Sequence, residues 1–93
     1  MSGHRIDMYY TYVLRGNNGR KYIGSTSDLK RRLKEHNGGV GGKYTQDNRP
    51  FKLIYYEGFL NKQDAFAREQ WLKTGWGRNQ INTMLKNYLQ KGE

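Results

Sequence analysis

Four side chains in the first half of the chain have types and spacing suited to chemistry on an anion. Tyr12 and Tyr22 each lie in a run of aromatic and β-branched residues, on either side of a segment rich in glycine and asparagine. Arg32 and His36 are four residues apart, so a helix would place them on one face. An arginine fork matches a phosphate, and a histidine titrates near neutral pH. These residues predict an anion site with titratable groups beside it.

The segment that must position this site reads as the end of a strand, a tight turn and a short basic helix. Tyr22 and Ile23 suit a half-buried strand, and Gly24 permits a close approach or a sharp turn. The hydroxyl residues 25–27 offer an N-cap, and Asp28 would then lie in the first helical turn. We expect the helix over about residues 27–37, with Leu29 and Leu33 packed on a sheet.

Two further strands and two further helices complete the predicted fold. Tyr9–Arg15 and residues 20–25 flank Gly16-Asn17-Asn18-Gly19, a strong hairpin signal that would bring Tyr12 near Tyr22. Residues 51–57 read as a third strand, and Asn61 caps the next helix. The apolar residues predicted to face the core from these helices are Ala65, Phe66, Trp71 and Leu72, and then, after an interruption at Gly75-Trp76-Gly77, Ile81, Met84, Leu85, Tyr88 and Leu89. The pattern predicts an α+β fold, a small three-stranded antiparallel sheet flanked by helices in the order β-β-α-β-α-α.

The composition favours a nucleic-acid partner. Seventeen Lys and Arg stand against eight Asp and Glu, the net charge is +9, and 14% of the residues are aromatic. The chain has no cysteine, which excludes disulfides and thiolate zinc sites. No apolar run approaches the roughly 20 residues of a membrane span, and the N-terminus lacks a signal-peptide core, so we expect a cytoplasmic protein. We expect residues 1–8 to be a flexible tail and residues 9–93 to form a single domain.

Several short motifs occur in an order that resembles the GIY-YIG nuclease family. They are Tyr10-Thr11-Tyr12, then Tyr22-Ile23-Gly24, then Arg32 and His36, and finally the run from Arg68 to Lys73. The first motif has Tyr10 and Thr11 where the family has Gly and Ile, and the second is intact. The likeness is greatest to small, single-domain bacterial members, which resemble the catalytic module of structure-specific endonucleases.

The resemblance implies a metal-dependent endonuclease that hydrolyses DNA phosphodiester bonds with Mg²⁺ or Mn²⁺, in DNA repair or recombination. By position, Tyr12 and Tyr22 would flank the scissile phosphate and position or deprotonate the attacking water. Arg32 would stabilise charge on the phosphoryl oxygens, and His36 would assist proton transfer. Glu69 would hold the metal. The family's late asparagine is matched only loosely, with Asn79 as the candidate beside Asn82.

The chemistry sets conditions on two of these roles. A free phenol is almost fully protonated at pH 7, so a tyrosine that deprotonates water needs cations nearby. Glu69 is the one candidate carboxylate, which suits a single Mg²⁺ that keeps several waters and takes substrate phosphate as a ligand. The alternative role for Glu69 is that of an ordinary helix glutamate paired with Arg68 or Lys73.

The remaining cations predict contacts to the nucleic-acid backbone. These residues are Lys30, Arg31, Lys34, Lys43, Tyr44 and Arg49, with the tyrosine as a stacking ring. Such contacts carry little base readout. Selectivity would therefore come from DNA shape, a protein partner or a homodimer, with no membrane involved.

Two other functions fit the same charge and size. One is a non-catalytic nucleic-acid-binding module of the same fold, which the altered first motif favours. The other is an RNA-binding protein associated with the ribosome. Convergence of Tyr22, Arg32 and Glu69 on one cleft would favour the enzyme over both.

Overall fold

Three antiparallel strands in the order β2-β1-β3 form the centre of the fold. The computed structural model describes residues 7–38 and 49–91, and the strands are β1 (Tyr9–Arg15), β2 (Lys21–Thr26) and β3 (Lys52–Phe59). The first two form the predicted hairpin, in which Tyr12 pairs with Gly24 and Leu14 with Tyr22. Because β1 is central, β2 and β3 are both edge strands.

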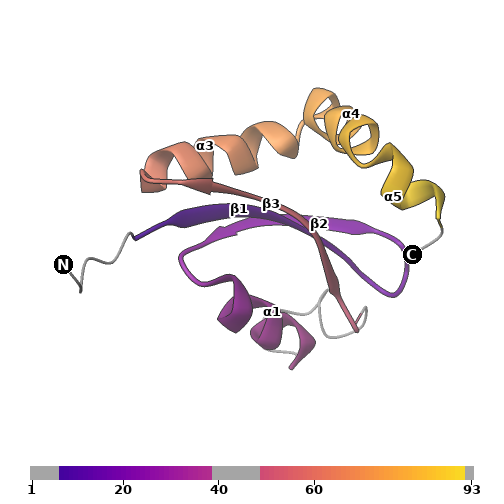
Figure 1. Ribbon diagram of the computed structural model, residues 1–93, viewed down its shortest axis with the longest axis horizontal. Coiled ribbons are helices and arrows are strands. Elements are labelled where there is room, and N and C mark those ends of the chain that lie inside the picture. The colour runs from indigo at the N-terminus through magenta and orange to yellow at the C-terminus, as the bar shows by residue number, and fades with distance from the viewer. Residues whose placement is uncertain (1–6, 39–48, 92–93) are drawn as a thin grey trace.

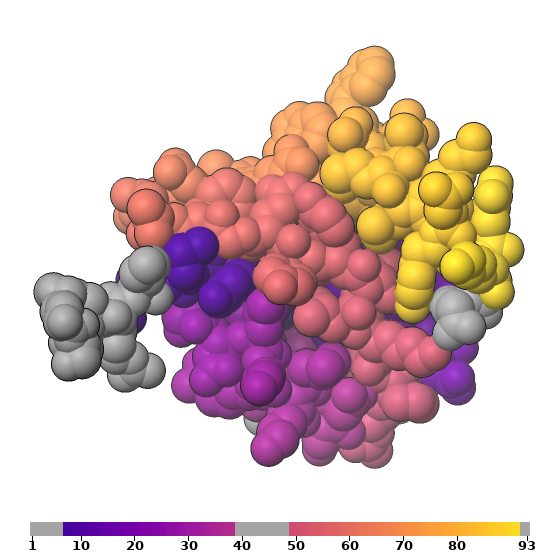
Figure 2. All heavy atoms as spheres, viewed as in Figure 1, coloured from indigo at the N-terminus to yellow at the C-terminus, as the bar shows by residue number. Residues whose placement is uncertain are grey.

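Helices cover both faces of this sheet. Helix α1 (Leu29–Asn37) lies on one face, and α3 (Lys62–Leu72), α4 (Gly75–Met84) and α5 (Lys86–Gln90) lie on the other (Figure 1). In the space-filling view the atoms of α3 to α5 form one layer and those of α1 form the opposite layer (Figure 2). The predicted α+β fold class is confirmed, with the last predicted helix divided into α4 and α5.

The alternation of β1 side chains divides the core in two. Tyr12 and Leu14 pack on the α1 side with Phe51, where Leu29 and Leu33 join them as predicted. Val13 points the other way and packs against buried residues of α3 and α4, Leu72 and Ile81. Each face of the central strand therefore anchors its own helical layer.

The end of α1 is fastened to the start of β3. The Asn37 side chain accepts a hydrogen bond from the Phe51 backbone N–H at 2.6 Å and donates one to its carbonyl at 3.2 Å. This pair satisfies both backbone groups as a neighbouring strand would. It fixes the helix that carries Arg32 and His36 against the sheet.

The structure corrects the predicted start of α1. The helix begins at Leu29, and its N-cap is Asp28, whose carboxylate accepts from the Arg31 backbone N–H. The expected cap was one of residues 25–27, with Asp28 inside the first turn. Ser25 and Thr26 are instead the last residues of β2.

Three predictions for the C-terminal helices are also corrected. Phe66 and Trp71 are 55% and 41% exposed, so the predicted buried face of α3 is narrower, with Ala65 and Leu72 in the core. Gly75 to Gly77 form the first turn of α4 behind the Thr74 cap. Gly77 is buried, and a Cβ there would overlap the Leu72 backbone, so this glycine lets α4 begin directly against α3. The amphipathic stretch that follows breaks at Leu85.

None of the helices in residues 7–38 and 49–91 is long and apolar enough to cross a membrane. Residues 1–6, which make up most of the predicted N-terminal tail, lie outside the described part of the chain.

Candidate active site at the free edge of β2

The hydroxyl of Tyr12 is the centre of a small polar cluster on the α1 side of the sheet. Arg32 Nε donates to Tyr12 Oη at 3.3 Å, and His36 Nε2 lies 3.2 Å from the same oxygen. Tyr12 is only 4% exposed. The predicted helical spacing of Arg32 and His36 therefore brings both side chains to one phenolic oxygen.

Gly24 gives the Tyr12 ring its space. The two residues are cross-strand partners, and a Cβ on Gly24 would lie 2.6 Å from Tyr12 Cζ. Such a distance is well inside van der Waals contact, so any side chain would displace the ring. The tyrosine ring thus crosses beneath β2 at the position where the strand has no side chain.

Arg32 keeps part of its guanidinium open to a ligand. Besides the bond to Tyr12, its Nη1 donates to Glu35 Oε1 at 3.0 Å, and the side chain is 33% exposed. These two partners raise the pKa of Arg32, chiefly through the hydrogen bond to Tyr12. A guanidinium has five N–H donors, so a charged fork remains for a phosphoryl oxygen.

The surroundings of His36 favour its neutral form. Burial lowers the pKa of His36, the Arg32 charge lowers it further, and Glu35 opposes both. Its Nδ1 is buried without a hydrogen-bond partner in the described residues. An unpaired buried N–H costs more than an unpaired lone pair. We therefore assign the tautomer with the proton on Nε2, in which Nε2–H donates a hydrogen bond to Tyr12 Oη.

Glu69 lies on the other face of the sheet. It is 8% exposed, and Ser25 Oγ donates to its Oε1 at 2.7 Å. Lys73 Nζ is 2.7 Å from Oε2. Ser25 shares its face with its cross-strand partner Thr11, whose hydroxyl donates to the Ala65 carbonyl of α3.

The two groups approach neighbouring residues of the edge strand β2 from opposite faces of the sheet. The Tyr12 cluster reaches this strand at Gly24 from the α1 side, and Glu69 reaches it at the next residue, Ser25, from the α3 side. Successive residues of a strand are about 3.3 Å apart. An anion at this edge can therefore face Arg32 on one side and Glu69 on the other. Arg32 and Glu69 do not share a cleft on one face of the sheet, because they lie on opposite faces.

Tyr22 lies on the same face as Tyr12 but is not hydrogen-bonded to it. Its ring packs edge-on against Phe51, with centroids 5.1 Å apart. It is also part of the lining of a hollow at the start of β2, together with Asn82. Tyr22 therefore flanks the edge site two positions from Gly24.

The residues predicted to contact DNA fall into two groups, one in the described part of the chain and one outside it. Lys30, Arg31 and Lys34 are exposed on α1, and Arg49 is exposed before β3. Arg31 also lines a hollow of about 270 Å³ beside Ser25. Lys43 and Tyr44 lie outside the described residues.

Asn79 and Asn82 differ in their positions on α4. The Asn79 carbonyl accepts from Thr83 Oγ1 at 3.1 Å, and the residue is exposed. Asn82 lines the hollow that also contains Tyr22. The geometry therefore favours Asn82 over Asn79 as an asparagine near the site.

Comparison with known proteins decides the family. Residues 8–82 match the family model described as the GIY-YIG catalytic domain. The chain belongs to the GIY-YIG family. It is 41% identical over 86 residues to the UPF0213 protein YsiG of Lactococcus lactis, covering 92% of this chain and 83% of that one.

Two solved structures of similar proteins agree with the fold. The solution structure of the UPF0213 protein BH0048 from Bacillus halodurans has a TM-score of 0.52 at 33% identity, covering 83% of this chain and 84% of that chain. The solution structure of EF2693 from E. faecalis has a TM-score of 0.53 at 34% identity, covering 95% and 91%. The sequence-based family resemblance is confirmed.

The GIY-YIG family implies a divalent metal, and Glu69 can be tested as its ligand. The residues described here contain no group of three or more His, Cys, Asp or Glu side chains that could hold a metal. Glu69 supplies one carboxylate with about four lone-pair sites, of which Ser25 and Lys73 engage two. This donor set fits Mg²⁺ held mainly by water and substrate phosphate, and it does not fit a closed protein cage.

Two residues of this candidate site were not among those predicted from the sequence. Ser25 is the hydrogen-bond donor to Glu69, and Glu35 is the ion-pair partner of Arg32. The i, i+3 spacing of Arg32 and Glu35 was a usable signal. Ser25 gave only the weak signal of a polar residue directly after the Tyr22-Ile23-Gly24 motif. The Glu69–Lys73 ion pair agrees with the alternative role of Glu69, a helix glutamate paired with Arg68 or Lys73.

The depressed pKa of His36 predicts a pH-dependent stability. The folded protein binds a proton at His36 less readily than the unfolded chain, whose histidine titrates near 6.5. The contribution of neutral His36 to the free energy of unfolding is therefore complete above pH 6.5 and is lost as the pH falls below that value. Urea unfolding between pH 5 and pH 8 should show this loss in the wild type, and His36→Gln should flatten it. An equal slope in both proteins would contradict the assignment.

Proposed function

We propose that this chain is a divalent-metal-dependent endonuclease that hydrolyses phosphodiester bonds in DNA. The observation that carries the proposal is the convergence at the edge of β2. Tyr12, with Arg32 and His36 bonded to its hydroxyl, lies at Gly24, and Glu69 lies at Ser25. Hydrolysis needs an oriented water, cations at the phosphoryl oxygens and help for the leaving oxygen. The residues of this edge are able to supply the first two.

Tyr12 is arranged to handle a proton. With Arg32 Nε–H and His36 Nε2–H both donating to its oxygen, its own O–H points away from both donors. There it can orient the attacking water or a phosphoryl oxygen. The two N–H donors also stabilise negative charge on the phenolic oxygen if its proton is passed on. Tyr22, two positions along the same edge, is the second phenol beside the attacking water.

Arg32 holds the phosphate, and Glu69 holds the metal. The free part of the guanidinium can bind two phosphoryl oxygens as a fork. Bound at Glu69, Mg²⁺ or Mn²⁺ would supply positive charge at the phosphoryl group and lower the pKa of a coordinated water. Ser25 orients the Glu69 carboxylate by its hydrogen bond.

The cations around this edge favour shape-selective recognition. Lys30, Arg31, Lys34 and Arg49 are suited to phosphates, which fix position but carry no sequence information. Branched, flapped or flexible DNA presents a single strand to an edge more readily than a regular duplex. We therefore assign the enzyme to structure-selective cleavage in DNA repair or recombination, with a protein partner or homodimer for targeting.

Cleavage of a panel of labelled DNAs tests this function. The panel contains duplex, flap, junction and single-stranded DNA, each with Mg²⁺, Mn²⁺ or chelator. We expect metal-dependent nicking that Glu69→Gln lowers by roughly 10²–10³-fold, the usual effect of removing one group that stabilises transition-state charge. The matched control is Asp64→Asn, an exposed acid on the same helix, which should retain full activity.

A second candidate function is a non-catalytic nucleic-acid-binding module. It is favoured by one observation, that both Glu69 oxygens already have partners, Ser25 and Lys73. In that case Glu69 is a structural residue, and Glu69→Gln should lower the melting temperature without changing DNA binding. Salt-sensitive binding with no cleavage of any panel member would replace the endonuclease by this module.

A further inference from the structure

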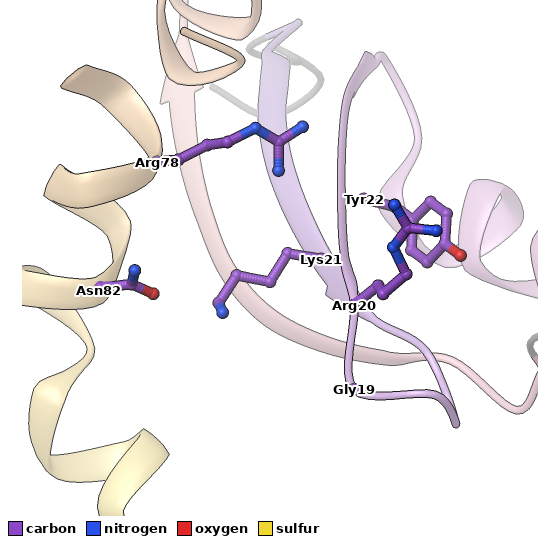
Figure 3. A pocket seen from close by; sticks show the side chains of 6 residues that line it. All are labelled: Gly19, Arg20, Lys21, Tyr22, Arg78 and Asn82. Carbon is purple, nitrogen blue, oxygen red and sulfur yellow. The ribbon is translucent and has the colours of Figure 1, made fainter. Parts of the chain in front are cut away.

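A basic hollow of about 580 Å³ lies between α4 and the start of β2, apart from the Tyr12 and Glu69 groups. Its lining residues are Gly19, Arg20, Lys21, Tyr22, Arg78 and Asn82. Figure 3 shows Arg78 and Lys21 extending into the space between helix and strand, with Asn82 on the helix beside it. Arg20 and Tyr22 lie on the other side of the strand in the same view.

The cations of this hollow are available to a ligand. Arg78 Nε donates to the Lys73 carbonyl at 3.3 Å, which anchors the side chain and leaves its two terminal nitrogens for another acceptor. Among the described residues, the ion pairs involve Arg31, Arg32, Arg68 and Lys73, and none involves Arg20, Lys21 or Arg78. Within the described part of the chain, the lining therefore contains three cations and no carboxylate, and two of the cations, Lys21 and Arg78, extend into the hollow.

The hollow continues the edge on which the active site lies. Tyr22 belongs to its lining, and Lys21 is three residues before Gly24 on the same strand. Three residues of strand span roughly 10 Å. A stacked nucleic-acid strand rises about 3.4 Å per nucleotide, so the same distance covers about three nucleotides.

A second hollow lies at the other end of the same strand. It is about 270 Å³ in volume and contains the hydroxyl residues Ser25, Thr26 and Ser27 with Arg31 and Lys62. Positive charge therefore flanks Gly24 in both directions along the edge of β2. An extended polyanion fits this arrangement better than a small anion, which would need donors converging on one point.

We infer that the hollow at Lys21 and Arg78 binds backbone phosphates of the substrate strand about three nucleotides from the scissile bond. This inference rests on the proposed endonuclease function, because the scissile bond is placed at Gly24. Arg78 and Lys21 contact phosphate oxygens, and Asn82 donates from the same helix. The hollow thus sets how far the strand must extend on one side of the cut.

Binding at several salt concentrations gives the first test. The probe is the panel DNA with the highest affinity, measured by fluorescence anisotropy without metal. Loss of one phosphate contact lowers the slope of log K against log[salt] by about 0.7 for single strands and 0.9 for duplex. We expect Arg78→Gln and Lys21→Gln each to lower it by about that amount. The control Lys52→Gln removes an exposed cation from β3, the opposite edge strand, and should leave the slope unchanged.

Shortened substrates give the second test. The scissile strand is trimmed from its 5′ end or from its 3′ end towards the cleavage site. With long substrates Arg78→Gln should lower kcat/KM about tenfold or more. In one of the two directions, trimming to fewer than about three nucleotides should remove the difference between wild type and variant. Arg78→Lys, which keeps the charge, should restore most of the binding slope.

The outcomes separate this inference from the proposed function. DNA cleavage by the wild type with unchanged salt slopes in Arg78→Gln and Lys21→Gln would overturn the proposed phosphate site in the hollow. The proposed endonuclease function would not be affected. Equal slope changes in Lys52→Gln would also overturn it, because they would indicate only net charge. If the wild type cleaves no DNA, the endonuclease fails, and the salt slopes alone decide whether the hollow binds nucleic acid.

Discussion

Replacing Arg32 with glutamine should lower the rate of DNA cleavage by about 10²–10³-fold, the range for removing one donor that stabilises developing charge. The guanidinium is the cation bonded to the Tyr12 hydroxyl, at 3.3 Å, and it keeps exposed N–H groups for the phosphate. Glutamine removes the charge and the fork together. The loss should therefore appear in kcat under saturating DNA, measured by single-turnover cleavage.

The neighbouring arginine provides the control for this experiment. Arg31 is exposed on the same helix, and its contact to Glu35 is long, at 3.9 Å. Arg31→Gln should weaken DNA binding and lower the slope of log K against log[salt] by the amount expected for one phosphate contact. The kcat of this variant should be unchanged. Equal losses of kcat in both variants would mean that the basic helix serves binding alone, and would remove Arg32 from the catalytic group.

The parts of the site that depend on local spacing were predictable from the sequence. Arg32 and His36 share a helical face because they are four residues apart, and that spacing survives any packing of the helix. Leu29 and Leu33 fix which face meets the sheet. The hairpin signal at residues 16–19 predicts that the two strands pair. The register that sets Gly24 opposite Tyr12 depends on where the turn closes, which is between Gly16 and Arg20.

The parts that depend on tertiary packing were not predictable. Which side of the sheet α3 covers decides that Glu69 meets Ser25 and not the Tyr12 cluster, and no local pattern in the chain encodes that choice. Phe66 and Trp71 illustrate the same limit, because helical spacing cannot tell how wide a face the sheet covers. Trp71 is instead covered by the guanidinium of Arg68, 5.1 Å from its ring centroid.

The position of Glu69 also shows that the residues of the motifs do not all lie on one face of the sheet. A sequence motif suggests one cleft lined by all its residues, whereas here the residues approach a single strand edge from two faces. Edge strands expose backbone groups that other chains can pair with. In this fold the β2 edge is bordered by cations and hydroxyl groups, which suits a phosphate backbone and disfavours another β-strand.

A methyl group at Gly24 should disable this site without removing any polar group, because it would crowd the Tyr12 ring and its hydroxyl. In Gly24→Ala the new Cβ would overlap the Tyr12 ring, and that ring is held by Arg32 and His36. Overpacking of this kind costs about 1–3 kcal/mol of stability. A displacement of about 1 Å at a reacting group can cost about 10²-fold in rate. We therefore expect a lower urea midpoint and a cleavage rate reduced by about 10²-fold.

Gly58 separates the effect of this crowding from that of alanine in a strand. A Cβ at Gly58 would lie 2.7 Å from Met8 Cε, the flexible end of a side chain that is able to move away. Gly58→Ala on β3 should therefore change stability by about 0.5 kcal/mol or less and leave cleavage intact. If Gly24→Ala behaved in the same way, the close contact of Tyr12 with β2 would not be what aligns its hydroxyl. The geometry at Gly24 would then carry no part of the catalysis, and the role of this glycine would be confined to the hairpin.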